Sequence, residues 1–302
     1  MKWCMSMNVI FEGNKTIVEG SGLSLKHTLE CGQAFRWLPY DDGYLGAAYG
    51  KALFIRESRD SVEMYPCSQE DFEGVWRGYF DLDTDYREIR KALAFDKYVG
   101  IGMDYAEGMH ILAQEPFETL ISFILSANNN VKRIQGIIER ICKRYGKKIE
   151  DGGFARNAFP TPDALAEAKV EDLEECGAGY RAPYIKHSAR MVRDGFDLEG
   201  LRCMEYEQAR KKLLALPGVG PKVAECILLF SLSHGCAFPI DVWVGRIMRT
   251  LYLDEDAKND EIECFAHDRF GSNAGLAQQC LFHYARNNGI SKGGMKHVEG
   301  EK

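Results

Sequence analysis

The chain has 302 residues, of which 45% are hydrophobic and 27% charged, and its formal net charge is −7 with a pI of about 5.6. These values exclude a wholly disordered or collagen-like chain, and the length suits roughly two domains with a substantial apolar interior. The acidic pI argues against a nucleic-acid partner, which usually meets a basic surface. No apolar run approaches the ~20 residues that span a bilayer, so we expect no membrane contact.

Targeting and metal signals are also absent from the sequence pattern. The first residues turn polar instead of forming an apolar signal core, so we expect no export signal and a cytoplasmic protein, associated with the nucleoid if the source is prokaryotic. The ten cysteines are scattered without a Cys-x-x-Cys pair. We therefore expect reduced, mostly buried thiols and no zinc or iron–sulfur ligand set.

The first hundred residues predict a small antiparallel sheet. Strand-like segments cover 33–38, 52–56 and 61–65, and Asp41, Asp42 and Gly43 predict a hairpin turn before a further strand at Tyr44. From Ser68 onward, apolar residues recur at three- and four-residue spacing, which indicates helices. We therefore expect an antiparallel α+β domain over residues 1–100.

Beyond about residue 84 the pattern is helical almost throughout. Pro116 suits the first turn of an apolar helix, and apolar residues at 131, 134, 137, 138, 141 and 145 form one buried helical face. Further helices are expected to start near 161–164 and 169–173. The sequence predicts a larger helical domain over 101–290 and a loose tail over 291–302, and the fold class is α+β.

Charge is distributed unevenly along the chain. Residues 1–130 carry a net −8, residues 131–250 a net +4 and residues 251–302 a net −3. Seven basic residues lie on one predicted helix or directly after it: Lys132, Arg133, Arg140, Lys143, Arg144, Lys147 and Lys148. Glu139 is the one acidic residue among them. Such a cluster could contact the phosphates of a DNA backbone or could form an ordinary solvated surface, and the sequence favours neither.

The most informative segment is 216–226, which reads LPGVGPKVAEC. A helix over 205–214 runs into the turn Gly218-Val219-Gly220, and Pro221 opens a second helix. The glycines permit close backbone approach, and the unpaired amides of the new helix face outward. This arrangement suits a phosphate of a DNA backbone, although a turn that only closes a helical hairpin fits these residues equally well.

Two ionisable side chains stand at predicted helix starts. Lys222 lies in the first turn of the second helix, where the helix dipole opposes a positive charge and favours a neutral, nucleophilic amine. Cys226 follows on the same face, and Asp241 is a candidate N-cap of a later helix. An amine and a carboxylate so placed suit nucleophilic displacement at a sugar carbon. A surface lysine, a buried thiol and a capping aspartate are the structural alternatives.

These motifs resemble a known family. The segment 216–226, followed by Asp241, resembles the helix-hairpin-helix, Gly/Pro-rich, aspartate (HhH-GPD) DNA glycosylases, and lysine at 222 resembles their bifunctional members. SFILSANNN at 122–130 and GQAFRW at 32–37 resemble the eukaryotic-type 8-oxoguanine DNA glycosylase/AP lyases, over residues 23–288. Cys264 and Cys280 do not supply the four-cysteine cluster usual in endonuclease III and adenine glycosylases.

The resemblance implies a TBP-like sheet domain followed by a helix-hairpin-helix domain. Lys222 would attack C1′ of the damaged nucleotide, form a Schiff base and lead to β-elimination, while Asp241 would support the transition state. No cofactor would be required, but the hairpin at 216–221 could hold a monovalent or divalent cation through backbone carbonyls. The partner would be double-stranded DNA, bound by a monomer.

The resemblance also implies a pocket for a flipped-out base, whose extrusion costs stacking and pairing energy. The carbonyl of Gly32 would accept from the N7–H that distinguishes 8-oxoguanine from guanine. Gln278 would read the Watson–Crick edge, while Phe282 and Cys226 would cover the two faces of the base. Gln278 and Phe282 are four residues apart, so a helix would place them together, as ordinary helix packing also would.

For the orphaned cytosine, the resemblance implies contacts from Asn128, Arg133 and Arg181, with Tyr180 as a wedge in the emptied stack. Arginine donors suit the acceptors of cytosine, and an asparagine amide offers both a donor and an acceptor. We therefore predict preference for 8-oxoguanine opposite cytosine. Trp243 stands where the family often has a histidine that supports a phosphate contact, so we expect that contact to be weaker.

Other functions remain open at this point. A glycosylase of the same superfamily could act on other oxidised or alkylated purines, although Lys222 argues against the monofunctional alkylbase enzymes and Gly32 with Gln278 favours an oxidised purine. A non-catalytic helix-hairpin-helix DNA-binding protein would need neither Lys222 nor Asp241. A small-molecule enzyme is favoured by the acidic pI alone.

Overall fold

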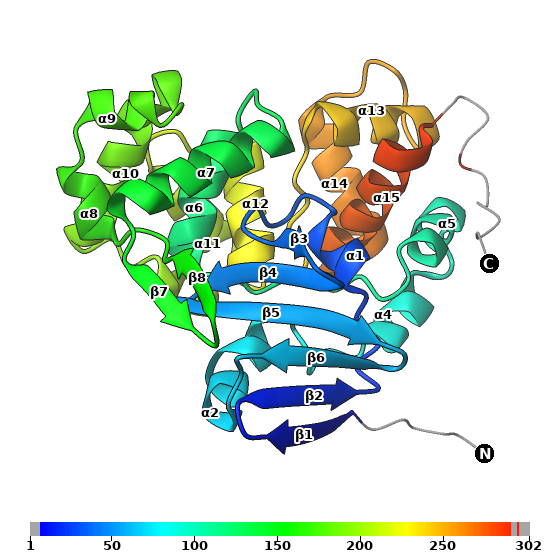
Figure 1. The fold of residues 1–302 in the computed structure, drawn as a ribbon. Coiled ribbons are helices and arrows are strands. Elements are labelled where there is room, and N and C mark those ends of the chain that lie inside the picture. The colour runs from blue at the N-terminus through cyan, green and yellow to red at the C-terminus, as the bar shows by residue number, and fades with distance from the viewer. Residues whose placement is uncertain (1–6, 291–294, 296–302) are drawn as a thin grey trace.

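The computed structural model describes residues 7–290 and residue 295. Within them, six antiparallel strands form one sheet in the order β1-β2-β6-β5-β4-β3. The strands are β1 (Asn8–Glu12), β2 (Lys15–Glu19), β3 (Leu38–Tyr40), β4 (Gly43–Ala48), β5 (Lys51–Ser58) and β6 (Ser61–Tyr65). The helical part of the chain gathers at the β3 and β4 end of this sheet, and β1 forms the far edge (Figure 1). This arrangement confirms the predicted α+β class.

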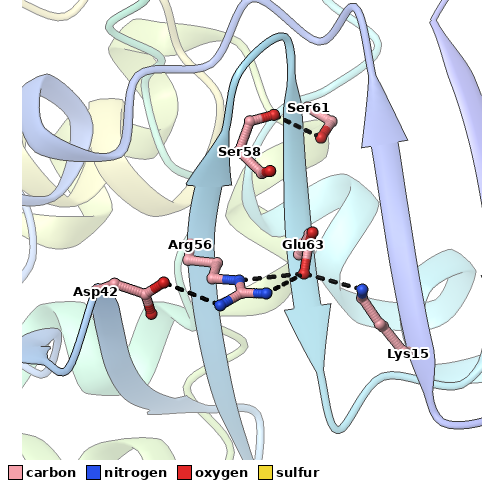
Figure 2. Close-up of polar contacts among 6 residues, drawn as sticks. All are labelled: Lys15, Asp42, Arg56, Ser58, Ser61 and Glu63. Carbon is pink, nitrogen blue, oxygen red and sulfur yellow. Dashed lines mark hydrogen bonds and ion pairs between the residues drawn. The ribbon is translucent and has the colours of Figure 1, made fainter.

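The hairpin turn and two of the strands lie where the sequence predicts them. Tyr40 pairs with Gly43 across the turn at Asp41 and Asp42, and the segments 52–56 and 61–65 fall within β5 and β6. Ion pairs then bridge the strands, because Arg56 contacts Asp42 and Glu63 at 2.9 Å each (Figure 2). Ion pairs at the surface of a sheet contribute little to stability, so the alternating burial of the strands sets the register.

The strand predicted at 33–38 is wrong for most of its length. Residues 33–37 form a buried loop, and β3 begins only at Leu38. The reason lies in Gln33, whose fully buried side chain donates to the carbonyls of Thr28 and His110 and accepts from the amide of Leu112. These bonds tie the loop to the short helix of Thr28 and to the segment 110–112 instead of to a neighbouring strand.

The helices follow the predicted order. They are α1 (Leu25–Leu29), α2 (Gln69–Asp71), a π-helical turn (Phe72–Trp76), α3 (Arg77–Tyr79), α4 (Tyr86–Leu93), α5 (Lys97–Tyr105), α6 (Pro116–Ser126), α7 (Val131–Tyr145), α8 (Pro162–Glu167), α9 (Val170–Glu175), α10 (Ala182–Arg193), α11 (Tyr206–Leu213), α12 (Pro221–Ser231), α13 (Val242–Leu251), α14 (Asn259–Phe270) and α15 (Ala274–Asn288). Pro116 occupies the first turn of α6, and Thr161 caps α8 by accepting from the amide of Ala164. Local capping and periodicity signals therefore located the starts of α6, α7, α8, α9, α11, α12 and α13, whereas α4, α5, α10, α14 and α15 had no predicted start.

One strand pair inside the helical region was not predicted. β7 (Lys148–Asp151) and β8 (Phe154–Asn157) form a hairpin that packs against β4 and β5 (Figure 1). The Phe154 ring lies 5.8 Å from Tyr40, 5.9 Å from Phe54 and 6.2 Å from Tyr65, centroid to centroid. This aromatic cluster fastens the hairpin to the sheet.

The helical core is centred on α6 and α12. Both helices are buried along almost their whole length, and Phe123 of α6 stacks on Phe230 of α12 at 5.5 Å. A second core lies around α5, α13, α14 and α15, and a third lies under the sheet. Because α12 is fixed on several sides, its first turn is a rigid position for a reactive side chain.

The structure also tests the predictions about the cysteines, membrane-spanning helices and the C-terminal tail. All nine described cysteines are free, and six of them are buried. No helix in this part of the chain combines the length and apolar character needed to cross a bilayer. The predicted tail over 291–302 lies outside the described residues except for Met295, which is buried.

Candidate active site

The segment 216–226 forms the predicted helical hairpin. α11 and α12 are joined by a turn in which Gly218 has φ +82°, and a Cβ there would lie 2.8 Å from Cβ of Tyr184 on α10. Gly220 is extended at the N-cap of α12, and a Cβ there would meet nothing within 4 Å. Ser188 of α10 supports the turn by donating to the carbonyl of Pro217 at 2.8 Å. The turn is therefore supported by α10, and no neighbouring residue covers it at Gly220.

Lys222 is a half-buried residue of the first turn of α12. Its Nζ lies 3.0 Å from Oγ of Ser126 and 4.9 Å from the ring centroid of Phe123, both on α6. A hydrogen bond and a cation–π contact thus hold the amine in one place. The alternative of an ordinary surface lysine does not account for these contacts, and nothing in the sequence indicated that Ser126 and Phe123 supply them.

Asp241 lies at the start of α13, and Cys226 lies one helical turn after Lys222 on α12. Asp241 caps α13 as predicted, because its carboxylate accepts from the amide of Val244 at 2.8 Å. Burial raises the pKa of the Cys226 thiol to about 11, the Lys222 ammonium opposes this shift, and the Asp241 carboxylate adds to it. Both charges act on one thiol, so the amine and the carboxylate share one neighbourhood.

Glu225 is a buried carboxylate of α12 that the sequence analysis missed. It pairs with Nε of Arg210 at 2.8 Å, accepts from the Tyr206 hydroxyl at 2.9 Å and accepts from the amide of Phe238 at 2.9 Å. Glu225 is on the helix of Lys222, and Phe238 is on the segment that leads to Asp241. The Glu225 network therefore connects the helix of Lys222 with the segment that precedes Asp241. The only sign of Glu225 in the sequence was a charged residue on a helix face that is otherwise apolar.

Glu225→Ala should lower the free energy of unfolding by about 3 kcal/mol, because it leaves Arg210 undercompensated and the Phe238 amide without its acceptor. Urea unfolding followed by circular dichroism measures the change. Glu225→Gln keeps an acceptor for Phe238, so its loss should be smaller. Glu175→Ala, which removes an exposed partner of Arg144, is the control. Equal stabilities for Glu225→Ala and the control would remove this role from Glu225.

The proposed base pocket is assembled from two distant segments. Gly32 has φ +93°, and a Cβ there would lie 3.9 Å from Cε1 of Phe282 and 3.5 Å from Nη1 of Arg286. Gln278 is 5% exposed, and its Oε1 has no hydrogen-bond partner within the described residues. An unpaired buried acceptor next to Phe282 on α15 is available to a ligand that donates. Arg286, whose guanidinium lies beside Gly32, was not singled out from the sequence.

Cys226 and Phe282 come from different parts of the interior. Cys226 packs in the core around α6 and α12, whereas Phe282 packs against the core around α15. The two side chains predicted to cover the faces of a base therefore belong to separate packing units. Their spacing is set by how α12 and α15 are held, and not by local sequence.

The residues predicted to contact the orphaned cytosine lie around one loop. The Arg181 guanidinium is buried and donates to the carbonyls of Ala127 at 3.0 Å and Asn128 at 3.2 Å. It also lies 4.3 Å from the ring centroid of Tyr180, which is 59% exposed. Arg133, on the first turn of α7, is exposed near the same loop. Arg181 thus shapes the loop, while Tyr180 and Arg133 remain accessible.

The basic cluster on α7 is partly used inside the protein. Arg144 pairs with Asp172 and Glu175, Arg140 donates to the carbonyl of Cys176, and Lys148 pairs with Glu150. α9 and β7 therefore supply acidic partners that lie outside the segment 132–148, where Glu139 is the one acidic residue. Lys132 and Arg133, at the other end of α7, show no ion pair in the described part of the chain.

Two further predictions concern Trp243 and a bound cation, and both stay predictions. Trp243 is 49% exposed on the first turn of α13 and so lies on the surface next to Asp241. Among the described residues, no group of three His, Cys, Asp or Glu side chains is placed to hold a metal ion. A cation bound by the carbonyls of the hairpin stays a prediction.

Comparisons with known proteins agree with this geometry. Residues 15–120 match the family model of the 8-oxoguanine DNA glycosylase N-terminal domain, and residues 121–269 match that of the HhH-GPD superfamily base excision DNA repair proteins. An N-glycosylase/DNA lyase of Saccharomyces cerevisiae is 32% identical over 90% of this chain and 86% of its own length. One from Arabidopsis thaliana is 37% identical over 86% of this chain and 76% of its own.

A solved structure shows the same fold. It is the Clostridium acetobutylicum 8-oxoguanine glycosylase/lyase in complex with double-stranded DNA containing cytosine opposite 8-oxoguanine. It shares 40% sequence identity with this chain at a TM-score of 0.91, over 95% of this chain and all of the other. The chain therefore belongs to the 8-oxoguanine DNA glycosylase/lyase family within the HhH-GPD superfamily, and it is a DNA glycosylase with AP lyase activity.

Proposed function

We propose that this enzyme excises 8-oxoguanine from double-stranded DNA, preferentially opposite cytosine, with Lys222 as the nucleophile. The observation that carries the proposal is the half-buried Lys222 amine, fixed by Ser126 and Phe123 and close to Asp241. Nζ of Lys222 forms a bond to C1′ while the bond from C1′ to the base breaks, and the base leaves with the bonding pair. Asp241 stabilises the positive charge that develops on the sugar.

Strand cleavage follows from the covalent adduct. Opening of the sugar converts the amine adduct to a protonated Schiff base, which acidifies the hydrogens at C2′. Loss of one C2′ proton and departure of the 3′ phosphate oxygen complete β-elimination, and water then releases Lys222. The nucleophile in this chemistry is the neutral amine, and the Ser126 hydroxyl can hold it because a hydroxyl both donates and accepts hydrogen bonds.

The base pocket supplies the choice of substrate. The Gly32 carbonyl accepts from N7–H of 8-oxoguanine, and the unpaired Oε1 of Gln278 accepts from the Watson–Crick edge. Phe282 and Cys226 cover the two faces of the base. The open turn of Gly218, Val219 and Gly220 contacts a DNA phosphate, and the backbone amides at the start of α12 suit that anion. A non-catalytic DNA-binding protein would need none of this pocket.

Wild-type enzyme should release 8-oxoguanine faster opposite cytosine than opposite the other three bases, and Arg133→Ala should reduce that preference roughly tenfold. Arg133 is exposed beside the Asn128 loop, so its removal deletes a donor to cytosine without disturbing a buried contact. Single-turnover release of the free base from four duplexes measures the preference. No release from any of them would overturn the proposed substrate.

Lys132→Ala is the matched control for Arg133, because Lys132 is an exposed cation on the same turn. It should weaken DNA binding for all four duplexes alike and leave their ranking unchanged. Arg181→Ala should lower all four rates, since Arg181 holds the Asn128 loop. An unchanged ranking in Arg133→Ala would remove Arg133 from recognition of the opposite base.

Several attributes accompany the proposal. The division into a domain of residues 1–100 and a domain of residues 101–290 stays a prediction, as do the monomeric state and the hairpin cation. A cytoplasmic or nucleoid-associated location agrees with a DNA substrate. Nothing in the site favours an alkylated base over an oxidised purine.

A further inference from the structure

A pair of histidines joins the two segments that form the proposed base pocket. His27 lies on α1, shortly before Gly32, and His283 lies on α15 next to Phe282. Nδ1 of His27 is 3.1 Å from Nε2 of His283, and the two rings meet edge to face with centroids 5.3 Å apart. This hydrogen bond connects the segment that carries Gly32 directly to the helix that carries Phe282.

The surroundings of His283 define which nitrogen carries the proton. Nδ2 of Asn287 lies 2.7 Å from the carbonyl of His283, which fixes this amide nitrogen as the donor side of Asn287. The same Nδ2 is 3.4 Å from Nδ1 of His283, so Nδ1 is the acceptor. Nε2 of His283 therefore holds the hydrogen and donates to Nδ1 of His27. Both rings are neutral, and Tyr105 of α5 packs on them at 5.6 Å and 5.4 Å.

We propose that His27 and His283 are positioning residues for lesion recognition, because their hydrogen bond holds Gly32 at a fixed distance from Phe282. The inference rests on the proposed function of the pocket. Gly32 lies close to Phe282, because a Cβ on Gly32 would be 3.9 Å from Cε1 of Phe282. If either segment moved outward, the Gly32 carbonyl would no longer be in hydrogen-bonding position for a base stacked on Phe282. Gln33 anchors the other side of the Gly32 loop to the connection at 110–112.

Acid should open this link. An added proton on His27 occupies Nδ1, the acceptor of the shared bond, and one on His283 occupies Nδ1, which faces Nδ2 of Asn287. Burial and Lys26 lower the pKa of His27, against Glu57 and Glu30, while burial, His27, Arg286 and Lys26 lower the pKa of His283 to about 4. Only protonation of His27 removes the acceptor of the shared bond, so the bond is intact above the ordinary histidine pKa of about 6.5 and is lost as the pH falls below it, through the lowered pKa of His27.

The test compares two substrates of one enzyme. Base excision from duplex DNA containing 8-oxoguanine needs the pocket, whereas cleavage at a preformed abasic site needs Lys222 and Asp241 but no base. His27→Leu removes the hydrogen bond, and the ratio of excision to abasic-site cleavage should fall about five- to tenfold. His27→Asn offers an acceptor near the position of Nδ1 and should keep the ratio. His234→Gln, at a half-buried histidine remote from the pocket, is the control.

Each outcome decides the inference. A lower ratio in His27→Leu, with its recovery in His27→Asn, supports the positioning role. So does a wild-type ratio that declines between pH 6.5 and 4.5 while the His27→Leu ratio stays flat. A parallel fall of both activities in His27→Leu indicates a merely structural pair and overturns it, as does an unchanged ratio. Wild type that cleaves abasic sites and releases no 8-oxoguanine would instead refute the proposed substrate, and with it the basis of the inference.

Discussion

Lys222→Gln is expected to abolish borohydride trapping on duplex DNA containing 8-oxoguanine and to lower base release by at least about 10³-fold. Borohydride links the enzyme to DNA only by reducing an iminium between an amine of the enzyme and C1′, and a carboxamide cannot form that iminium. Glutamine still reaches towards Oγ of Ser126, so the first turn of α12 keeps a polar contact. The loss is therefore one of chemistry and not of folding.

The measurement is a denaturing gel that separates the covalent protein–DNA adduct from free DNA. Lys211→Gln, at an exposed lysine of α11 in the same hairpin, should trap as wild type does. Thermal unfolding of both variants should match that of wild type. A persistent adduct in Lys222→Gln, or base release at the wild-type rate, would assign the nucleophile to another residue.

Asp241→Asn should reduce the single-turnover rate of base release by about 10²- to 10³-fold with little change in stability. Asparagine and aspartate are equally good N-caps, so the hydrogen bond from the amide of Val244 survives. The carboxylate charge that faces the developing positive charge on the sugar is lost. Asp241→Asn therefore tests the charge of Asp241 separately from its role as the N-cap of α13.

Asp241→Ala supplies the comparison, because it removes the charge and the cap together and should also cost ~1 kcal/mol of stability. The two variants should be similarly slow and differ in thermal midpoint. Asp85→Asn, at the aspartate that caps α4, is the control for a charge change at an N-cap and should leave the rate unchanged. A wild-type rate in Asp241→Asn would limit Asp241 to a capping role.

The elements that the sequence predicted are those specified by neighbouring residues. α7 spans 131–145 because its apolar face repeats with the helical period, and α12 begins where Pro221 follows Gly220. Asp241 is an N-cap by its residue type and its place before a helix. In each case the information lies within one or two turns of chain, so it can be read without knowledge of the fold.

The contacts that escaped prediction join residues distant in sequence. Ser126 forms a hydrogen bond with Lys222, and Glu225 accepts one from the amide of Phe238. Gln33 lies in a loop and not in the predicted strand, and it donates to the carbonyl of His110. None of these pairings has a periodicity or a spacing that marks it. The resemblance to a family assigned roles to site residues, but the side chains that hold those residues in place became apparent only from the packing of α6, α11 and α12.

The buried thiols have a consequence for an enzyme that acts on oxidised DNA. Burial raises the pKa of Cys31 and Cys67 to about 11, as it does for Cys226, and the pKa of Cys142 and Cys280 to about 12. Oxidants attack the thiolate, which is therefore scarce at these five positions at neutral pH. Peroxides and other oxidants that require a thiolate should therefore react slowly with these five thiols, and among the described cysteines the exposed Cys203 and Cys264 are more accessible to them.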